Sequence, residues 1–99
     1  MEAYAVHIKG LGKDENGFQK VIWLTESQAD VVTEMRNDVE KRHRMVEVGN
    51  YRFSPIDVMF MEKQKRDHYD LPKYFLDRKR KEQDNLIESS SKPVTKLLN

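Results

Sequence analysis

Apolar residues near the start of the chain recur at every second position. Tyr4, Val6 and Ile8 follow this period of two, which is typical of a strand with one buried face. Residues 18–24 predict a second strand, and the unbroken apolar run at its end indicates burial on both faces. The polar segment 10–17 between them is rich in glycine, so we expect the two strands to form a hairpin.

The next segment carries the signals of a helix. Thr25 is suited to the N-cap position, and Gln28 three residues later completes a capping box. Acidic residues near the start of this segment and basic residues near its end suit the helix dipole. Apolar residues at spacings of three and four form one face of a helix over residues 26–42, namely Ala29, Val32, Met35 and Val39.

Three further short strands are predicted after this helix. Residues 45–48 and 51–53 flank a Gly-Asn pair, which is typical of the turn in a tight hairpin. A Ser-Pro pair then predicts a single helical turn, and residues 58–61 predict the last strand. The predicted fold class is α+β, with a small antiparallel β-sheet in the order β-β-α-β-β-β and one covering helix.

The composition changes after Glu62. Residues 63–88 are mostly polar and basic, and within them residues 73–87 predict a second helix whose apolar side chains lie only at its two ends. Residues 89–99 begin with three serines and predict a flexible tail. We therefore expect a core domain over residues 1–62, followed by a basic, partly helical C-terminal arm and the tail.

Charge is sorted along the chain although the total is only +1. Residues 1–62 contain eight Lys or Arg against eleven Asp or Glu, whereas residues 63–81 contain eight against three. A mildly acidic body thus precedes a strongly basic segment. Such a segment is suited to an anionic surface of a protein or of a nucleic acid.

The sequence shows no catalytic signature. It contains no cysteine, which excludes disulfides and thiolate chemistry. The glycine-rich segment 10–17 lacks both the dinucleotide fingerprint and the P-loop pattern. His7, His43 and His68 do not show the spacing of metal ligands. We therefore predict that the protein is not an enzyme and binds no cofactor and no metal ion.

The basic arm supplies the candidate residues for contact with a partner. Cationic side chains bind carboxylates or phosphates, and aromatic side chains anchor protein interfaces or stack on bases. The favoured interpretation is a small binding module that modulates a protein complex by occupying its surface. The alternative is an accessory protein that binds nucleic acid with the same arm. The candidate residues are Lys73, Tyr74, Phe75, Arg78, Arg80 and Lys81.

Two other surfaces are candidates for contact. Asp30, Glu34 and Asp38 recur every four residues on the predicted first helix and form a secondary acidic patch. Three interpretations of this acidic column are open. It is a solvated helix face, a surface that binds a basic partner, or the docking site of the chain's own basic arm. A basic partner could be a DNA-binding protein, for which the column would imitate the phosphates of DNA. Residues 58–61 are apolar on both faces, so an exposed edge there would allow a homodimer by strand pairing.

Residues 21–62 resemble small uncharacterised proteins of bacteriophages and prophages of Gram-positive bacteria. In these proteins a Thr-Glu-x-x-Ala helix start is followed by a glycine turn, a Tyr-x-Phe strand and a Ser-x-x-Asp turn. The resemblance implies a cytoplasmic accessory or inhibitor protein that binds a host macromolecule. No apolar run approaches the roughly 20 residues that span a bilayer, so we expect no membrane partner. The matching positions are Thr25, Glu26, Ala29, Gly49, Tyr51, Phe53, Ser54 and Asp57.

Overall fold

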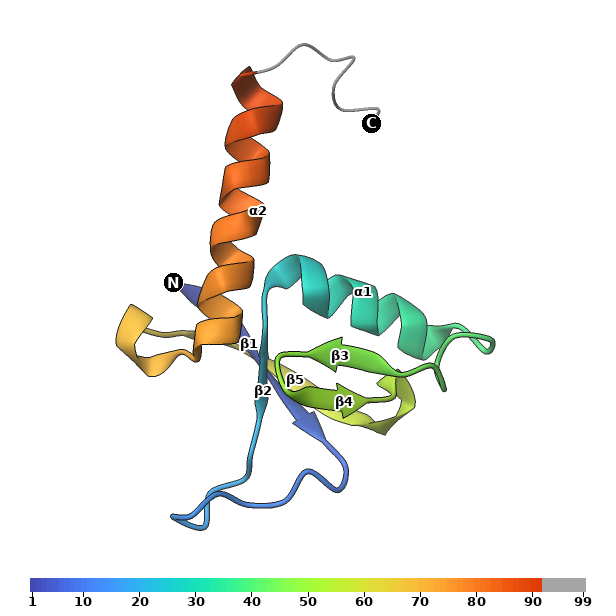
Figure 1. Cartoon of the computed structure of the whole chain (residues 1–99). Coiled ribbons are helices and arrows are strands. Elements are labelled where there is room, and N and C mark those ends of the chain that lie inside the picture. Colours follow the sequence, from blue (N-terminus) through green and yellow to red (C-terminus); the bar gives the residue numbers. More distant parts are fainter. Residues whose placement is uncertain (92–99) are drawn as a thin grey trace.

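The structure is a computed structural model that describes residues 1–91, with side chains for residues 1–84. Five strands, two helices and two single 3-10 turns, labelled η, follow one another along these residues (Figure 1). This mixture of helix and strand confirms the predicted α+β class. The elements are β1 (Glu2–Ile8), β2 (Ile22–Leu24), α1 (Glu26–Asn37), β3 (Val46–Val48), β4 (Tyr51–Phe53), η1 (Pro55–Asp57), β5 (Val58–Lys65), η2 (His68–Asp70) and α2 (Lys73–Ser91).

The strands form two antiparallel sheets, whereas the sequence predicted one. β1 is the central strand of a three-stranded sheet with the order β2-β1-β5, and β3 and β4 form a separate hairpin. The pairing of β1 with β2 confirms the predicted first hairpin, but β2 begins only at Ile22. The carboxylate of Asp14 accepts hydrogen bonds from the backbone N–H groups of Asn16 and Phe18, each at 2.9 Å. These bonds hold residues 14–18 in a turn, which delays the strand.

α1 begins where the sequence predicts and ends earlier than predicted. The capping box of Thr25 and Gln28 is present at its start. At its end Asp38 has extended backbone angles, and its Oδ1 accepts a hydrogen bond from the backbone N–H of Glu40 at 2.8 Å. This local bond competes with helical bonding and stops the helix at Asn37. Val39, which was predicted on the buried helix face, is therefore 71% exposed.

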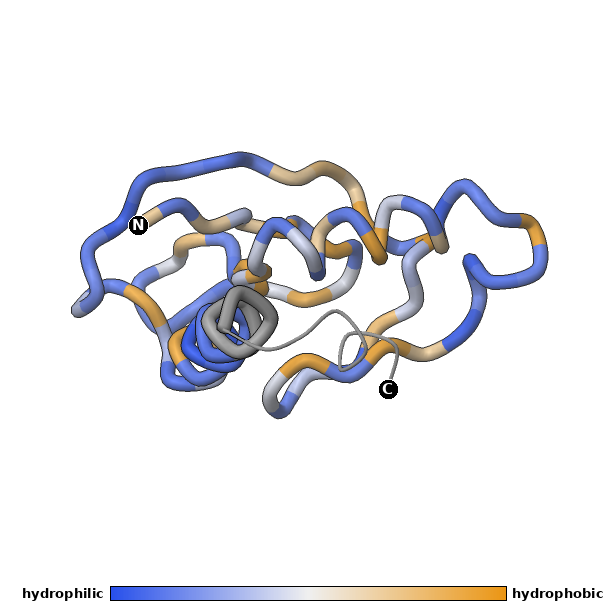
Figure 2. Tube along the Cα trace, turned by 90° about the horizontal axis from the view of Figure 1, so that it is seen from above, coloured by the Kyte–Doolittle hydropathy of each residue, from blue (hydrophilic) through white to orange (hydrophobic). Residues whose placement is uncertain are grey.

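Each face of the three-stranded sheet is covered by different parts of the chain, because successive side chains of a strand point to opposite sides. Val6 and Ile8 belong to the main core, which also contains the buried face of α1 and residues of the β3–β4 hairpin. Ala3 points to the other side and is buried against Leu71 and Phe75. Figure 2 shows the apolar segments gathered where the strands and α1 meet, whereas α2, seen end on, is mostly hydrophilic.

β5 is longer than predicted and includes the first basic residues of the arm. Gln64 and Lys65 pair with Ala3 and Glu2 of β1, so the predicted domain boundary at residue 62 falls inside a strand. The ladder continues one residue further, because the backbone N–H of Arg66 donates to the carbonyl oxygen of Met1 at 2.8 Å. The start of the arm thus completes the sheet.

The strand order places β5 at an edge of its sheet. Met59 and Phe60 are 62% and 48% exposed, and the register shift between His7 and Ile8 lies opposite them. The Phe60 ring stacks on His7 with 4.0 Å between ring centroids. A homodimer through residues 58–61 stays a prediction.

α2 starts after the Leu71-Pro72 break, as predicted, and its later turns project away from the sheet (Figure 1). It continues through residues 89–91, the first three positions of the predicted tail. The remaining positions of that tail, residues 92–99, lie outside the described residues.

Candidate functional site

The two aromatic residues of the predicted contact set lie at the base of α2 and face the sheet. Phe75 is fully buried against Ala3 and Leu71. Because the side chain of Ala3 is small, there is space beside β1, and the ring of Phe75 fills this space. Burial of this kind does not fit the predicted role of Phe75 as a contact residue. Its role is to fix α2 on the sheet.

Tyr74 closes the free edge of β2. The backbone N–H of Trp23, which β1 does not use, donates a hydrogen bond to the Tyr74 hydroxyl at 3.0 Å. The Tyr74 ring meets Tyr51 edge-on at 6.2 Å between centroids. Burial raises the pKa of Tyr74 above its ordinary value of 10.0, and the hydrogen bond from Trp23 offsets only part of this rise. The hydroxyl thus satisfies an edge donor that another strand would otherwise have to pair.

Tyr74→Phe is expected to lower the free energy of unfolding by about 1 kcal/mol, because the part-buried Trp23 N–H loses its acceptor. Since the pKa of Tyr74 is raised in the folded state, its stabilising effect is present below pH 10 and is lost as the pH rises through the folded pKa. Urea unfolding at about pH 8 and about pH 11 measures both effects, and the variant should lose less stability than the wild type between these pH values. The control is Tyr69→Phe, at a residue that is 94% exposed, and equal stability of Tyr74→Phe and wild type at the lower pH would contradict the assignment.

Glu82 joins α2 to the start of α1. Its carboxylate accepts hydrogen bonds from the hydroxyls of Thr25, at 2.8 Å, and Ser27, and it lies 3.3 Å from the guanidinium of Arg78. Burial acts to raise the pKa of Glu82, but the two hydroxyl bonds and the charges of Arg78 and Lys79 outweigh it, so the pKa lies below 4.5. A negative charge at this position also suits the positive end of the α1 dipole.

Loss of the Glu82 charge is expected to loosen this contact. A lowered pKa means that the stabilisation is present above the unfolded pKa and is lost as the pH falls through the folded pKa, so it disappears only below about pH 4.5. At neutral pH, Glu82→Gln should therefore lower the amide protection factors of Thr25 and Ser27, which are the exchange rates of an unfolded chain divided by the observed rates at the same pH, toward the values of the acidified wild type. The matched control is Asp84→Asn, which removes an exposed carboxylate from the same helix. Unchanged exchange in Glu82→Gln would show that this contact does not hold the helices together.

The secondary acidic patch is only partly a helical column. Asp30 and Glu34 are exposed on α1, whereas Asp38 follows the helix and serves as its C-cap. Among the side chains that the structure describes, no ion pair links this patch to α2. The alternative in which the basic arm docks on the acidic column has no support from these contacts and stays a prediction. α2 meets α1 through Glu82 at the start of the helix.

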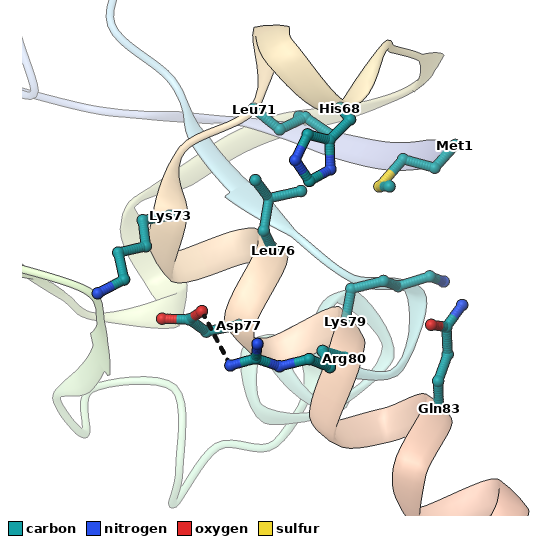
Figure 3. A pocket seen from close by; sticks show the side chains of 9 residues that line it. All are labelled: Met1, His68, Leu71, Lys73, Leu76, Asp77, Lys79, Arg80 and Gln83. Atoms are coloured by element: carbon teal, nitrogen blue, oxygen red, sulfur yellow. Dashed lines mark ion pairs between the residues drawn. The ribbon is translucent and has the colours of Figure 1, made fainter.

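A groove of about 600 Å³ opens where the first turns of α2 lie beside η2 and the start of β1 (Figure 3). Pockets that bind ligands have volumes of about this size. Met1, Leu71 and Leu76 give the groove apolar surface. We call it the basic groove, and its lining residues are Met1, His68, Leu71, Lys73, Leu76, Asp77, Lys79, Arg80 and Gln83.

Cations outnumber carboxylates around the basic groove. Lys73, Lys79 and Arg80 lie on its border, and Asp77 is the only carboxylate among its described lining residues. Asp77 lies 3.5 Å from the guanidinium of Arg80, and this exposed ion pair cancels one of the positive charges (Figure 3). The charges of Lys73 and Lys79 therefore make this partly apolar groove positive overall.

The six predicted contact residues therefore separate into three groups. Lys73 and Arg80 line the basic groove. Tyr74, Phe75 and Arg78 contact other residues of the fold, namely Trp23, Ala3 and Glu82. Lys81 is exposed on α2 but is not among the residues that line the groove.

Sequence patterns alone missed several groove residues. The spacing of Leu76, Lys79 and Gln83 by three and four would have placed them on one face of α2. No local signal connects Met1 or His68 to this site. They reach it because β1 pairs with β5 along its whole length.

Within the residues that the structure describes, no three His, Asp or Glu side chains are grouped so that they could hold a metal ion. The same residues contain no helix whose length and apolar content would let it cross a bilayer.

Comparison with known proteins found no matching family model, no matching curated protein and no matching solved structure. The resemblance of residues 21–62 to phage and prophage proteins stays a prediction. The geometry of the basic groove is thus the main basis for inferring a function.

Proposed function

We propose that the protein is a non-catalytic binding module that holds an acidic segment of a protein partner in the basic groove. The observation that carries this proposal is that the lining of one groove combines the apolar residues Leu71 and Leu76 with the cations Lys73 and Lys79. An acidic segment with one apolar side chain would bury that side chain in the groove and place its carboxylates beside the lysines. Burial would supply the affinity, and charge would supply the orientation.

Several features favour a protein over a nucleic acid as the partner. Phe75 is fully buried, so its ring is not free to stack on a base. Two of the cations of α2 are paired with carboxylates of the same helix, Arg78 with Glu82 and Arg80 with Asp77, which reduces the positive charge left for phosphates. Nucleic-acid binding is accordingly one outcome of the test below.

The biological role that we propose follows the resemblance of residues 21–62. A phage-type accessory or inhibitor protein in the host cytoplasm would occupy a surface of a host complex and block it. The basic groove is suited to this task, because a peptide segment bound in it would be withdrawn from other partners.

The test is a titration of the 15N-labelled full chain with a peptide in which one leucine is flanked by Glu and Asp residues. Amide shifts are expected at Leu76, Lys79 and Gln83, with a Kd weaker than about 1 μM because the segment is short and flexible. A peptide with Gln and Asn in place of the acids should bind at least about tenfold more weakly, since its charges are absent.

Charge reversal locates the binding surface. Lys79→Glu is expected to weaken binding of the acidic peptide at least about tenfold, whereas Lys13→Glu, which makes the same charge change in the exposed loop after β1, should leave it unchanged. Equal losses in both variants would mean that only net charge matters and would contradict a site in the groove. Tighter binding of a single-stranded oligonucleotide, with a steep salt dependence, would favour the nucleic-acid alternative.

A further inference from the structure

A second groove, of about 390 Å³, gathers aromatic residues from four elements. It is lined by the single tryptophan of the chain, Trp23 of β2, and by three of its four tyrosines, Tyr51 of β4, Tyr69 of η2 and Tyr74 of α2. Pro72 lies among them. Tertiary structure alone brings these rings together. We call this the aromatic groove; among the described residues, Leu71 is the one that lines both this groove and the basic groove.

Stability of the fold does not explain all of these rings. Tyr69 is 94% exposed, so its ring contributes little burial. Trp23, Tyr51 and Tyr74 are half-buried and leave part of each ring accessible beside it. Single exposed aromatic residues are ordinary on a protein surface, but a cluster of Trp and Tyr in one groove is typical of binding sites.

The polar atoms of the aromatic groove select a ligand that accepts hydrogen bonds. The Tyr74 hydroxyl already accepts from the Trp23 backbone, so its own O–H is left to donate. The hydroxyls of Tyr51 and Tyr69 and the indole N–H of Trp23 are also donors. A matching ligand offers carbonyl oxygens and flat apolar rings.

A proline-rich segment has this chemistry. In the polyproline II conformation its backbone carbonyls make no internal hydrogen bonds, and proline has no N–H that would need an acceptor. Its rings pack on aromatic faces, and its conformation is largely formed before binding, which lowers the entropy cost. Asp70 is the only charged residue in the described lining of this groove, so it complements a cation on the ligand and disfavours a phosphate backbone.

We infer that the aromatic groove binds a proline-rich protein segment in the polyproline II conformation, with a basic residue of the segment beside Asp70. Arg66 lies over the Trp23 ring, 5.4 Å from its centroid, and restrains it from the side of β5. The ring therefore needs little ordering when the ligand arrives. This site goes beyond the acidic-segment function of the basic groove and does not depend on it.

Fluorescence of the single tryptophan reports on the site directly. The full chain is titrated with a peptide that contains Pro-x-x-Pro followed by Arg, and with a matched peptide in which Ala replaces each Pro. We expect a saturable change in Trp23 emission with the first peptide and at least about tenfold weaker binding of the second. Absence of a saturable change with the proline peptide, or equal affinity of the two peptides, would overturn the inference.

Variants identify the groove as the site. Tyr69→Ala removes an exposed ring and is expected to lower the affinity for the proline peptide at least about tenfold. Phe18→Ala removes another exposed ring and should leave this affinity unchanged. Asp70→Asn should weaken the Arg-bearing peptide by about threefold and leave a version without Arg unchanged. Equal affinities of Tyr69→Ala and wild type, or tighter binding of an oligonucleotide that competes with the peptide, would contradict the assignment. Binding of the acidic peptide to the basic groove should survive Tyr69→Ala, which separates the two sites.

Discussion

Phe75→Ala is expected to lower the free energy of unfolding by about 3–4 kcal/mol, because the ring fills the space between α2 and the sheet. The Phe75 ring is fully buried, and its neighbours Ala3 and Leu71 belong to a cluster too small to collapse into the space that it leaves. Because domains of this size are stable by only about 5–15 kcal/mol, the loss would be a large part of the total. Urea denaturation followed by circular dichroism measures it.

The matched control is Phe18→Ala, because Phe18 is 71% exposed and its removal should change stability by less than about 0.5 kcal/mol. Local unfolding provides a second measurement. In Phe75→Ala, amide exchange should rise in the first turns of α2 more than in β1, since Phe75 anchors the helix base while β1 also pairs with β2 and β5. A loss below about 1 kcal/mol would mean that α2 is not anchored by this ring.

Gly49→Ala is expected to lower the free energy of unfolding by about 2–4 kcal/mol through two separate effects. Gly49 has φ +58°, a conformation that costs a residue with a Cβ about 1 kcal/mol. A Cβ at this position would also lie 2.8 Å from two ring atoms of Tyr74. Those atoms sit near the start of a side chain held by its bond to Trp23, so they yield only if the edge of β2 is disturbed.

A second glycine separates the two effects. Gly17 has φ +83°, and no atom lies within 4 Å of the place that a Cβ would occupy, so Gly17→Ala carries the backbone cost alone, about 1 kcal/mol. Combining Gly49→Ala with Tyr74→Ala removes the clash, and the double variant should be more stable than the sum of the two single losses predicts. Strict additivity would show that the Tyr74 contact is not the cause.

The base of α2 links the stability of the fold to both proposed sites. Leu71 lines the basic groove and the aromatic groove and packs beside Phe75. Phe75→Ala should therefore lower the affinities for the acidic peptide and for the proline peptide together. Lys79→Glu should lower only the affinity for the acidic peptide, and Tyr69→Ala only that for the proline peptide. This pattern distinguishes loss of structure from loss of a contact.

Interactions between near neighbours in the chain determined what was predictable from the sequence. The capping box of Thr25 and Gln28, the Gly-Asn turn between β3 and β4, and the helical turn after Ser54 each depend on residues within a few positions of one another. The α+β class followed from the periods of the apolar residues. The early end of α1 was also encoded locally, since Asp38 bonds to Glu40, but the apolar spacing of Val39 concealed it.

Tertiary structure alone decided the number of sheets, the burial of Phe75 and the composition of both grooves. A period of two marks a strand but not its neighbour, so the separation of the β3–β4 hairpin from β1 could not be foreseen. Phe75 is buried because Ala3, far away in the sequence, leaves room for its ring. Met1 and His68 reach α2 only through the pairing of β1 with β5, and Trp23 meets Tyr69 and Tyr74 only because α2 closes the β2 edge. Local hydrogen bonding sets the elements of this protein, whereas long-range packing sets which of their side chains remain free to bind.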